Sequence, residues 1–152
     1  MNLSCLVIDD VKLNREAMLD LIGSVEFLTP AGSCESALEA VNVMKELEPE
    51  VVFLDIEMPG MTGLEFIKTL QNPPLIVMTT SHKEYASEGF DLNVFDYLVK
   101  PITRERFTKC ANKIYDHFKK RKNQPQIDQI FVKSNNKYVR VKLNEILSLL
   151  KK

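Results

Sequence analysis

Three short apolar runs of the sequence each end in charged side chains. In chain order these are Asp9 with Asp10, then Asp55, then Lys100. Apolar runs of this length, separated by segments of helical period, predict buried strands of a parallel sheet. In an open α/β sheet the polar chemistry gathers at the carboxyl ends of the strands. The sequence therefore predicts one sheet edge with three carboxylates and an ammonium group, a layout suited to a divalent cation and a phosphoryl group.

The predicted cluster has a definite chemistry. Close carboxylates repel one another by about 4 kcal/mol per pair at a near-surface effective dielectric, and Mg²⁺, which prefers one or two carboxylates plus water and phosphate oxygens, would remove that cost. The ammonium of Lys100 suits an incoming phosphoryl oxygen. Asp55, alone at the end of the central predicted strand, is best placed to act as a nucleophile and become an aspartyl-phosphate. Thr79, Thr80 and Ser81 supply hydroxyls after the fourth predicted strand, at the same edge.

Strands and helices alternate along the first 120 residues. The expected strands are 3–8, 26–31, 51–54, 75–78 and 94–99. The expected helices are 14–22, 34–47, 64–70, 83–92 and 104–120. Strict alternation implies right-handed crossovers and a parallel sheet with helices on both faces. On helix 34–47 the helical period is followed by Ala37, Leu38, Val41, Met44 and Lys45.

The pattern changes after residue 123. Strand patterns at 130–132 and 138–141 flank Ser134-Asn135-Asn136 and predict a hairpin. From Lys119 to Lys152 ten basic residues face two acidic ones, a balance of +8, whereas residues 1–118 have a balance of −9. Such a split suggests two functional parts. A solvated helix end is the simpler explanation of the basic run at 119–122 itself.

Length and composition set broad limits on the class of protein. A chain of 152 residues is long enough for one domain with a core of its own. No apolar stretch approaches the roughly 20 residues of a membrane span, and the start lacks the charged region of a signal peptide. Widely spaced Cys5, Cys34 and Cys110 predict buried thiols rather than disulfides, so we expect a cytoplasmic protein. His82 and His117 show no ligand spacing and are expected at the surface.

The motifs together resemble the receiver domain of two-component response regulators, over residues 1–122. The resemblance is carried by Asp9-Asp10, by Asp55 within the segment 54–60, by the hydroxyl after the fourth strand and by the segment 96–101. It implies a flavodoxin-like, doubly wound (βα)5 fold with parallel strand order 2-1-3-4-5, followed here by a short C-terminal β segment.

The resemblance also implies roles for the clustered residues. Asp55 would accept a phosphoryl group from a sensor histidine kinase. Mg²⁺ would be held by Asp10, Asp55 and the backbone carbonyl of Glu57, with Asp9 helping through a water molecule. Lys100 would pair with the phosphoryl oxygens.

A switch pair follows from the same resemblance. Thr80, followed by the small Ser81, fits the family's switch hydroxyl best, and Thr79 is second. Tyr97 fits the switch aromatic. On phosphorylation such receivers commonly form homodimers through one face, which here comprises helix 83–92, strand 94–99 and helix 104–120.

The tail, 131–141, resembles the first strands of a LytTR-type DNA-binding domain. The expected organisation is a receiver at 1–122, a linker at 123–129 and a truncated start of the output domain at 130–152. The implied function is transcription regulation, with DNA bound only through a full-length output domain and no membrane partner.

Three other functions were weighed against this one. A stand-alone receiver that signals by protein contact is the main alternative. A phosphatase with an aspartyl nucleophile would usually carry a second aspartate two residues further on, where this chain has Glu57, so we expect no enzyme. A flavodoxin-like electron carrier would need a phosphate-binding hydroxyl loop where Asp9 and Asp10 stand.

Overall fold

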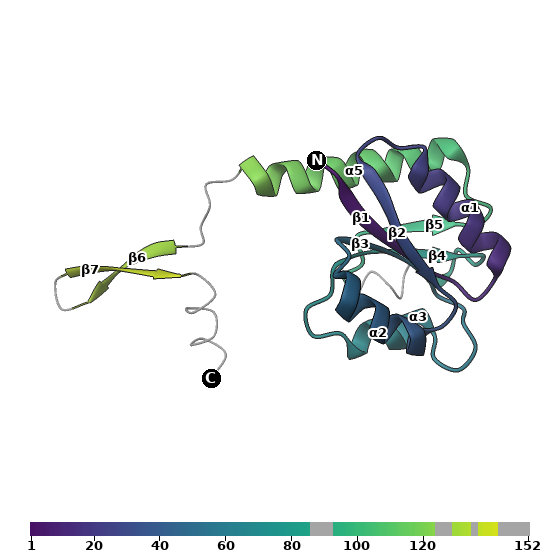
Figure 1. Cartoon of the computed structure of the whole chain (residues 1–152), viewed down its shortest axis with the longest axis horizontal. Helices are drawn as coiled ribbons and strands as arrows, with labels where there is room; N and C mark the ends of the chain where they lie inside the picture. The colour runs from purple at the N-terminus through teal and green to yellow at the C-terminus, as the bar shows by residue number, and fades with distance from the viewer. Residues whose placement is uncertain (86–92, 124–128, 135–136, 143–152) are drawn as a thin grey trace. The chain divides into compact units, whose positions relative to one another are not determined.

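The computed structural model describes residues 1–85, 93–123, 129–134 and 137–142. Five parallel strands form one sheet in the order β2-β1-β3-β4-β5, which confirms the predicted flavodoxin-like topology (Figure 1). The strands are β1 Leu3–Ile8, β2 Leu28–Cys34, β3 Val51–Asp55, β4 Leu75–Thr80 and β5 Asp96–Val99. The helices are α1 Lys12–Gly23, α2 Ala37–Leu47, α3 Gly63–Thr69 and α5 Arg104–Asn123.

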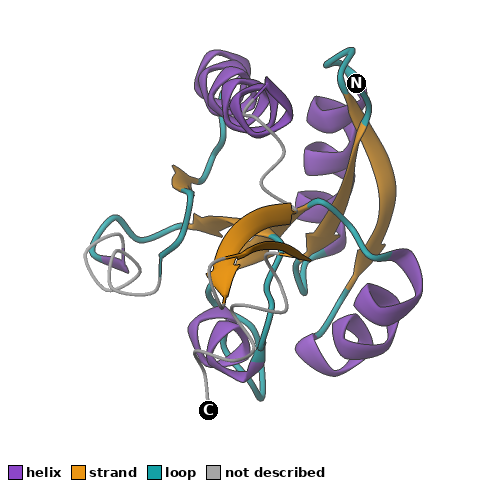
Figure 2. Ribbon diagram, turned by 90° about the vertical axis from the view of Figure 1, so that its left-hand side faces the viewer, coloured by secondary structure: helices purple, strands orange, loops and turns teal. Residues whose placement is uncertain are grey.

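Helices cover both faces of the sheet. In Figures 1 and 2, α1 and the first part of α5 lie on one side, and α2 and α3 lie on the other. Every residue of β3 is buried, as expected of a central parallel strand covered on both faces. Because successive side chains of a strand point to opposite faces, Phe53 meets Phe107 of α5 with 5.6 Å between ring centroids, whereas Leu54 joins the cluster on the other side.

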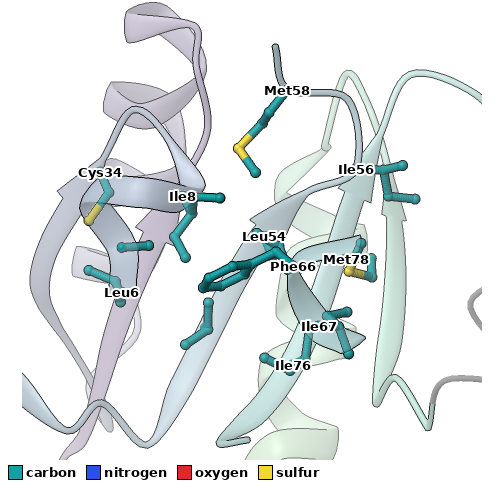
Figure 3. Close-up of a cluster of buried hydrophobic side chains, with 13 residues drawn as sticks. Leu6, Ile8, Cys34, Leu54, Ile56, Met58, Phe66, Ile67, Ile76 and Met78 are labelled. Carbon is teal, nitrogen blue, oxygen red and sulfur yellow. The ribbon is translucent and has the colours of Figure 1, made fainter. Parts of the chain in front are cut away.

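The core between the sheet and the α2–α3 side is dense and apolar (Figure 3). It draws alternate residues from β1, β3 and β4 and packs them against Phe66 and Ile67 of α3. Met58 extends this cluster into the loop that follows Asp55 and is 6% exposed. The buried side chain of Met58 thus anchors this loop to the core.

The same loop ends in a well-defined helix start. The Thr62 side chain accepts a hydrogen bond from Glu65 N, and the Glu65 carboxylate accepts one from Thr62 N, both at 3.1 Å. This reciprocal capping box satisfies two backbone donors that a helix start otherwise leaves unpaired. Gly60 provides the turn, at φ +82, a conformation that glycine adopts without steric cost. Both ends of the loop are therefore fixed.

α2 buries only part of the set of residues that follow the helical period. Leu38 is 82% exposed and Val41 is 38% exposed, whereas Ala37 and Ala40 are buried. Met44 of the periodic set and Val43 also pack against the core cluster, so the period identified the packed side only in part. The helix also starts later than predicted, at Ala37 after the N-cap Ser36, since Cys34 still belongs to β2.

The predicted thiols and the predicted hairpin are both confirmed. Cys5, Cys34 and Cys110 are buried thiols that are not joined in disulfides, and burial raises the pKa of Cys5 to about 12. Strands β6 Gln129–Ser134 and β7 Lys137–Lys142 pair antiparallel. In the described part of the chain no helix is both long and apolar enough to cross a bilayer.

Two expectations fall partly or wholly outside what the structure describes. Residues 86–92 of the expected helix 83–92 are not described, and with them part of the expected dimer face. The chain divides into two compact units, Met1–Ala111 and Asn112–Lys152, with the boundary inside α5. The predicted domain limits at 122 and 130 stay predictions.

Gly63 begins α3 at a very close approach to the end of β3. A Cβ at this position would lie 3.1 Å from both Asp55 C and Ile56 Cα, and closer still to the Asp55 carbonyl oxygen. We expect Gly63→Ala to lower the free energy of unfolding by roughly 1–3 kcal/mol, the usual cost of overpacking. Urea unfolding followed by circular dichroism measures this change.

The matched control is Gly23→Ala, at the last residue of α1, where an added Cβ meets nothing within 4 Å. Helix propensity there favours alanine by up to about 1 kcal/mol. If the two variants unfold at the same urea concentration, the close approach at Gly63 does not contribute to the free energy of unfolding.

Candidate functional site

The predicted edge of the sheet is present. Asp9 follows β1 directly, Asp55 is the last residue of β3, and Lys100 follows β5. Asp9 and Asp55 are each 3% exposed, and Asp10 is more accessible. Carboxylate oxygens of Asp9, Asp10 and Asp55 all lie within 4.8 Å of one another. The structure thus brings together three carboxylates from the ends of two strands, β1 and β3.

Lys100 joins two of these carboxylates. Its Nζ lies 2.9 Å from Asp9 Oδ2 and 3.2 Å from Asp55 Oδ1. Its backbone N–H donates to the carbonyl of Thr80 at 2.7 Å, which fixes the strand exit next to β4. The ammonium therefore stands between Asp9 and Asp55, in position to compensate two buried negative charges.

Burial and the opposite charge of the neighbouring group shift the pKa of Asp55, and likewise that of Lys100, in opposite directions. Burial raises the pKa of Asp55 to about 7; Lys100 opposes the rise, and the charge of Asp9 adds to it. Burial disfavours the ammonium of Lys100, but the hydrogen bond to Asp9 and the charges of both carboxylates more than offset this and raise its pKa. The cluster thus keeps its lysine charged and holds a proton on Asp55 more readily than an exposed carboxyl group would.

Backbone and side-chain contacts hold Asp9 in place. Its Oδ1 accepts from Val11 N at 2.9 Å, and its carbonyl oxygen accepts from Arg15 Nη1 at 2.8 Å. Asp9 is not the cap of α1, because the N-cap is Val11 and no side chain caps this helix. Sequence analysis missed Arg15, since nothing in its spacing sets it apart from other basic residues on a helix.

The two candidate switch hydroxyls have different surroundings. Thr79 lies opposite Asp55 in the β3–β4 register and lines a cavity of about 190 Å³ together with Asp9 and Lys100. Thr80 is 1% exposed, and its hydroxyl donates to Glu57 Oε1 at 2.8 Å. Both threonines belong to β4, which runs two residues further than predicted.

Glu57 takes part through its side chain as well as its backbone. Its N–H donates to Asp55 Oδ1 at 3.3 Å, and its Oε2 lies 3.4 Å from His82 Nε2. His82 is exposed, as predicted, but its ring also lies 3.4 Å from Glu84 Oε1. The family resemblance implied a role only for the Glu57 carbonyl, because side-chain contacts between separate segments leave no periodic signal in the sequence.

Tyr97 lies in β5, partly buried against the core cluster. Arg106 of α5 donates through Nη2 to Asp96 Oδ1 at 2.8 Å and to the Tyr97 carbonyl at 2.9 Å. The hydrogen bond to Asp96 raises the pKa of Arg106. This clamp between α5 and β5 was not predicted, since Arg106 looked like one more charge on an amphipathic helix.

The acidic cluster fits a hard divalent cation. Carboxylate oxygens are the ligands that Mg²⁺ prefers, at about 2.1 Å, so two ligands of one ion stand at most about 4.2 Å apart. The observed limit of 4.8 Å is only a few tenths of an ångström larger than that span. The fit therefore rests on donor type and spacing together.

A family model described as response regulator receiver domain matches residues 5–112. An uncharacterized response regulatory protein of Vibrio cholerae is 35% identical over 150 residues, which cover 95% of this chain and 63% of that protein. The sensory transduction protein LytT of Oceanobacillus iheyensis is 30% identical over 152 residues, covering 96% of this chain and 62% of that protein. The transcriptional regulatory protein BtsR of Salmonella typhi is 38% identical over 111 residues, covering 72% of this chain and 46% of that protein. The chain thus spans less than two thirds of the length of each relative.

Solved structures of response regulator domains also resemble this chain. The response regulatory domain of protein mrkE from Klebsiella pneumoniae has a TM-score of 0.70 at 25% identity, covering 77% of this chain and 98% of that one. The isolated REC domain of RcsB from Salmonella enterica serovar Typhimurium, solved with the phosphomimetic BeF3-, has a TM-score of 0.71 at 19% identity, covering 76% and 90%. The second likeness supports the fold alone.

The raised pKa of Asp55 predicts an unusual dependence of stability on pH in metal-free buffer. The unfolded chain releases this proton near pH 4, whereas the folded protein keeps it until about pH 7. Between these values the folded state binds more protons, so the contribution of Asp55 to the free energy of unfolding falls as pH rises. We expect a fall on the order of 2–4 kcal/mol across this window.

Urea unfolding at several pH values in EDTA, with Asp55→Asn beside the wild type, isolates this contribution. Asparagine has no proton to release. The free energy of unfolding of the variant, relative to that of the wild type, should therefore rise from pH 4 to pH 7. A constant difference over that range would mean that Asp55 titrates normally.

Proposed function

The chain belongs to the response regulator receiver family, and from that premise we propose that Asp55 accepts a phosphoryl group from a histidine kinase. One observation carries the proposal: a buried aspartate at the end of the central strand lies 3.2 Å from Lys100 Nζ and next to two further carboxylates. Burying a charged carboxylate without compensation costs free energy, so the grouping of these side chains indicates a chemical function. Phosphoryl transfer provides one.

The proposed step is a displacement at phosphorus. A carboxylate oxygen of Asp55 forms a bond to phosphorus, the bond from phosphorus to the histidine nitrogen or acyl oxygen of the donor breaks, and the leaving group takes the electron pair. The ammonium of Lys100 shifts from Asp55 to the new phosphoryl oxygens, where its charge is needed more. Asp55 must be deprotonated to attack, and its raised pKa opposes deprotonation. A nearby positive charge is therefore important, because it stabilises the carboxylate form.

We propose Mg²⁺ as the cofactor. Asp10, Asp55 and the carbonyl of Glu57 would hold it, with Asp9 assisting. When bound, it supplies charge neutralisation for the carboxylates and for the phosphoryl oxygens. The accessibility of Asp10 supports the assignment, since it leaves an approach from solvent.

The proposed response is a shift between two populations. Thr80 and Lys100 would turn toward the phosphoryl group, and Tyr97 would turn inward. Strand 94–99 and helix 104–120 would then present an altered face for homodimer formation, together with the expected helix 83–92. Thr79 stays the second candidate for the switch hydroxyl because it lies in register with Asp55.

The proposed output is LytTR-type regulation of transcription. A relative named LytT and one named a transcriptional regulatory protein support it, as does the β6–β7 hairpin. An isolated hairpin is marginally stable in water, so DNA binding is assigned to a complete output domain. A receiver that acts by protein contact alone is the alternative.

Phosphorylation of Asp55 is tested with acetyl phosphate and Mg²⁺, followed by intact-mass measurement. The wild type should gain one phosphoryl group and Asp55→Asn none. Asp20→Asn, which changes an exposed aspartate of α1, is the matched control and should be phosphorylated like the wild type. Equal gain by Asp55→Asn, on Asp10 or elsewhere, would contradict the proposal.

Mg²⁺ binding is tested by thermal unfolding. A tenfold excess of free ion over its Kd stabilises the folded state by about 1.4 kcal/mol, since the unfolded chain has no such site. For a chain of this size this corresponds to a Tm rise of roughly 2–5 °C. Asp10→Asn should lose the rise and Asp20→Asn should keep it. Coincident melts with and without millimolar Mg²⁺ would remove the cation from the proposal.

A further inference from the structure

The Thr80 hydroxyl has hydrogen-bond partners on both its donor side and its acceptor side. Glu57 Oε1 is its near acceptor at 2.8 Å, the His82 carbonyl oxygen is a more distant one at 3.4 Å, and the hydroxyl accepts from His82 N at 3.0 Å. A hydroxyl has a single hydrogen to donate. Thr80 can therefore give that hydrogen to Glu57 or to a phosphoryl oxygen on Asp55, but not to both.

The acceptor side of this hydrogen bond is itself held in place. Glu57 Oε2 lies 3.4 Å from His82 Nε2, and the Glu57 N–H donates to Asp55 Oδ1. A hydroxyl that donates to a carboxylate makes a charge-assisted bond, stronger than one between neutral groups. The Glu57 side chain is 39% exposed, which weakens the bond relative to a buried one.

We propose that Glu57 is a positioning residue that holds the Thr80 hydroxyl in the resting state and must release it before Thr80 can bind a phosphoryl group on Asp55. The inference rests on the proposed function of Asp55. Activation then exchanges one charge-assisted hydrogen bond of Thr80 for another. Since a ligand shifts an equilibrium only by its differential affinity for the two states, Glu57 lowers the apparent affinity of the site for the phosphoryl group.

The displaced Glu57 carboxylate can turn into an open cavity at the surface. Glu57 lines an open surface cavity of about 390 Å³ with Met58, Thr62, Leu64 and Tyr85. A charged side chain that turns toward solvent recovers its hydration, so release of Thr80 leaves no buried charge without a partner. The main chain of the loop can stay in place, because Met58 is buried in the core and Thr62 is fixed by the capping box.

The test is a titration of the phosphoryl mimic beryllofluoride with Mg²⁺, followed by ¹⁹F NMR, which reports the bound species directly. Glu57→Ala should bind about three- to tenfold more tightly than the wild type, the range expected from losing one partly exposed charge-assisted hydrogen bond. Glu57→Gln keeps an acceptor without its charge and should fall between the two. Glu84→Ala is the matched control, because Glu84 contacts His82 as Glu57 does, and it should bind like the wild type.

The negative charge of Glu57 could also repel the mimic without any role for Thr80, and a double-mutant cycle separates the two causes. In a Thr80→Val background the hydroxyl is gone, so Glu57→Ala should tighten binding less than twofold. Equal tightening in both backgrounds, or none in the wild-type background, would overturn the inference while leaving the role of Asp55 intact. Failure of the wild type to bind beryllofluoride at all would instead overturn the proposed function.

Discussion

One ammonium group shared between two buried carboxylates is the interaction on which the site depends. Asp9 and Asp55 are almost fully buried, and Lys100 Nζ lies within 3.2 Å of an oxygen of each. Removing such charges from water costs several kcal/mol per ion unless opposite charge and hydrogen bonds compensate. The three groups come from the ends of three different strands, so this compensation exists only when β1, β3 and β5 share one sheet in the observed order. The charge balance of the site is thus a property of the topology.

Around this cluster the backbone leaves little freedom. Gly63 N donates to the Ile56 carbonyl at 2.8 Å, and the approach there excludes a Cβ. Met58 fills the core below the loop, and the Thr62–Glu65 capping box closes its far end. Rearrangement on this side of the site therefore falls to side chains, above all those of Glu57 and Thr80. A rigid frame with a few movable polar groups suits the proposed shift between two populations.

The sequence was most informative where one physical rule links position to structure. Apolar runs that end in charge marked the carboxyl ends of the strands, and β-α alternation implied one parallel sheet with Asp9, Asp55 and Lys100 at the same edge. The strand order itself came from the family resemblance. The helical period was a weaker guide on α2, which buries Ala37 and Ala40 and leaves Leu38 exposed. Contacts between side chains of separate segments, such as Thr80 at the end of β4 with Glu57 in the loop after β3, depend on rotamers and carry no periodic signal. The same holds for Arg15 and Arg106, whose partners lie in other elements.

The clamp between α5 and β5 sets a rule for building hybrids of such domains. Arg106 reaches back across the turn to Asp96, whose side chain is 10% exposed, and to the carbonyl of Tyr97. A hybrid that joined β5 of this chain to the last helix of another would deprive a nearly buried carboxylate of its guanidinium partner. Splice points that keep residues 96–106 from a single parent preserve the pair. The junction with a foreign output module then belongs beyond this segment, in the exposed basic end of the helix.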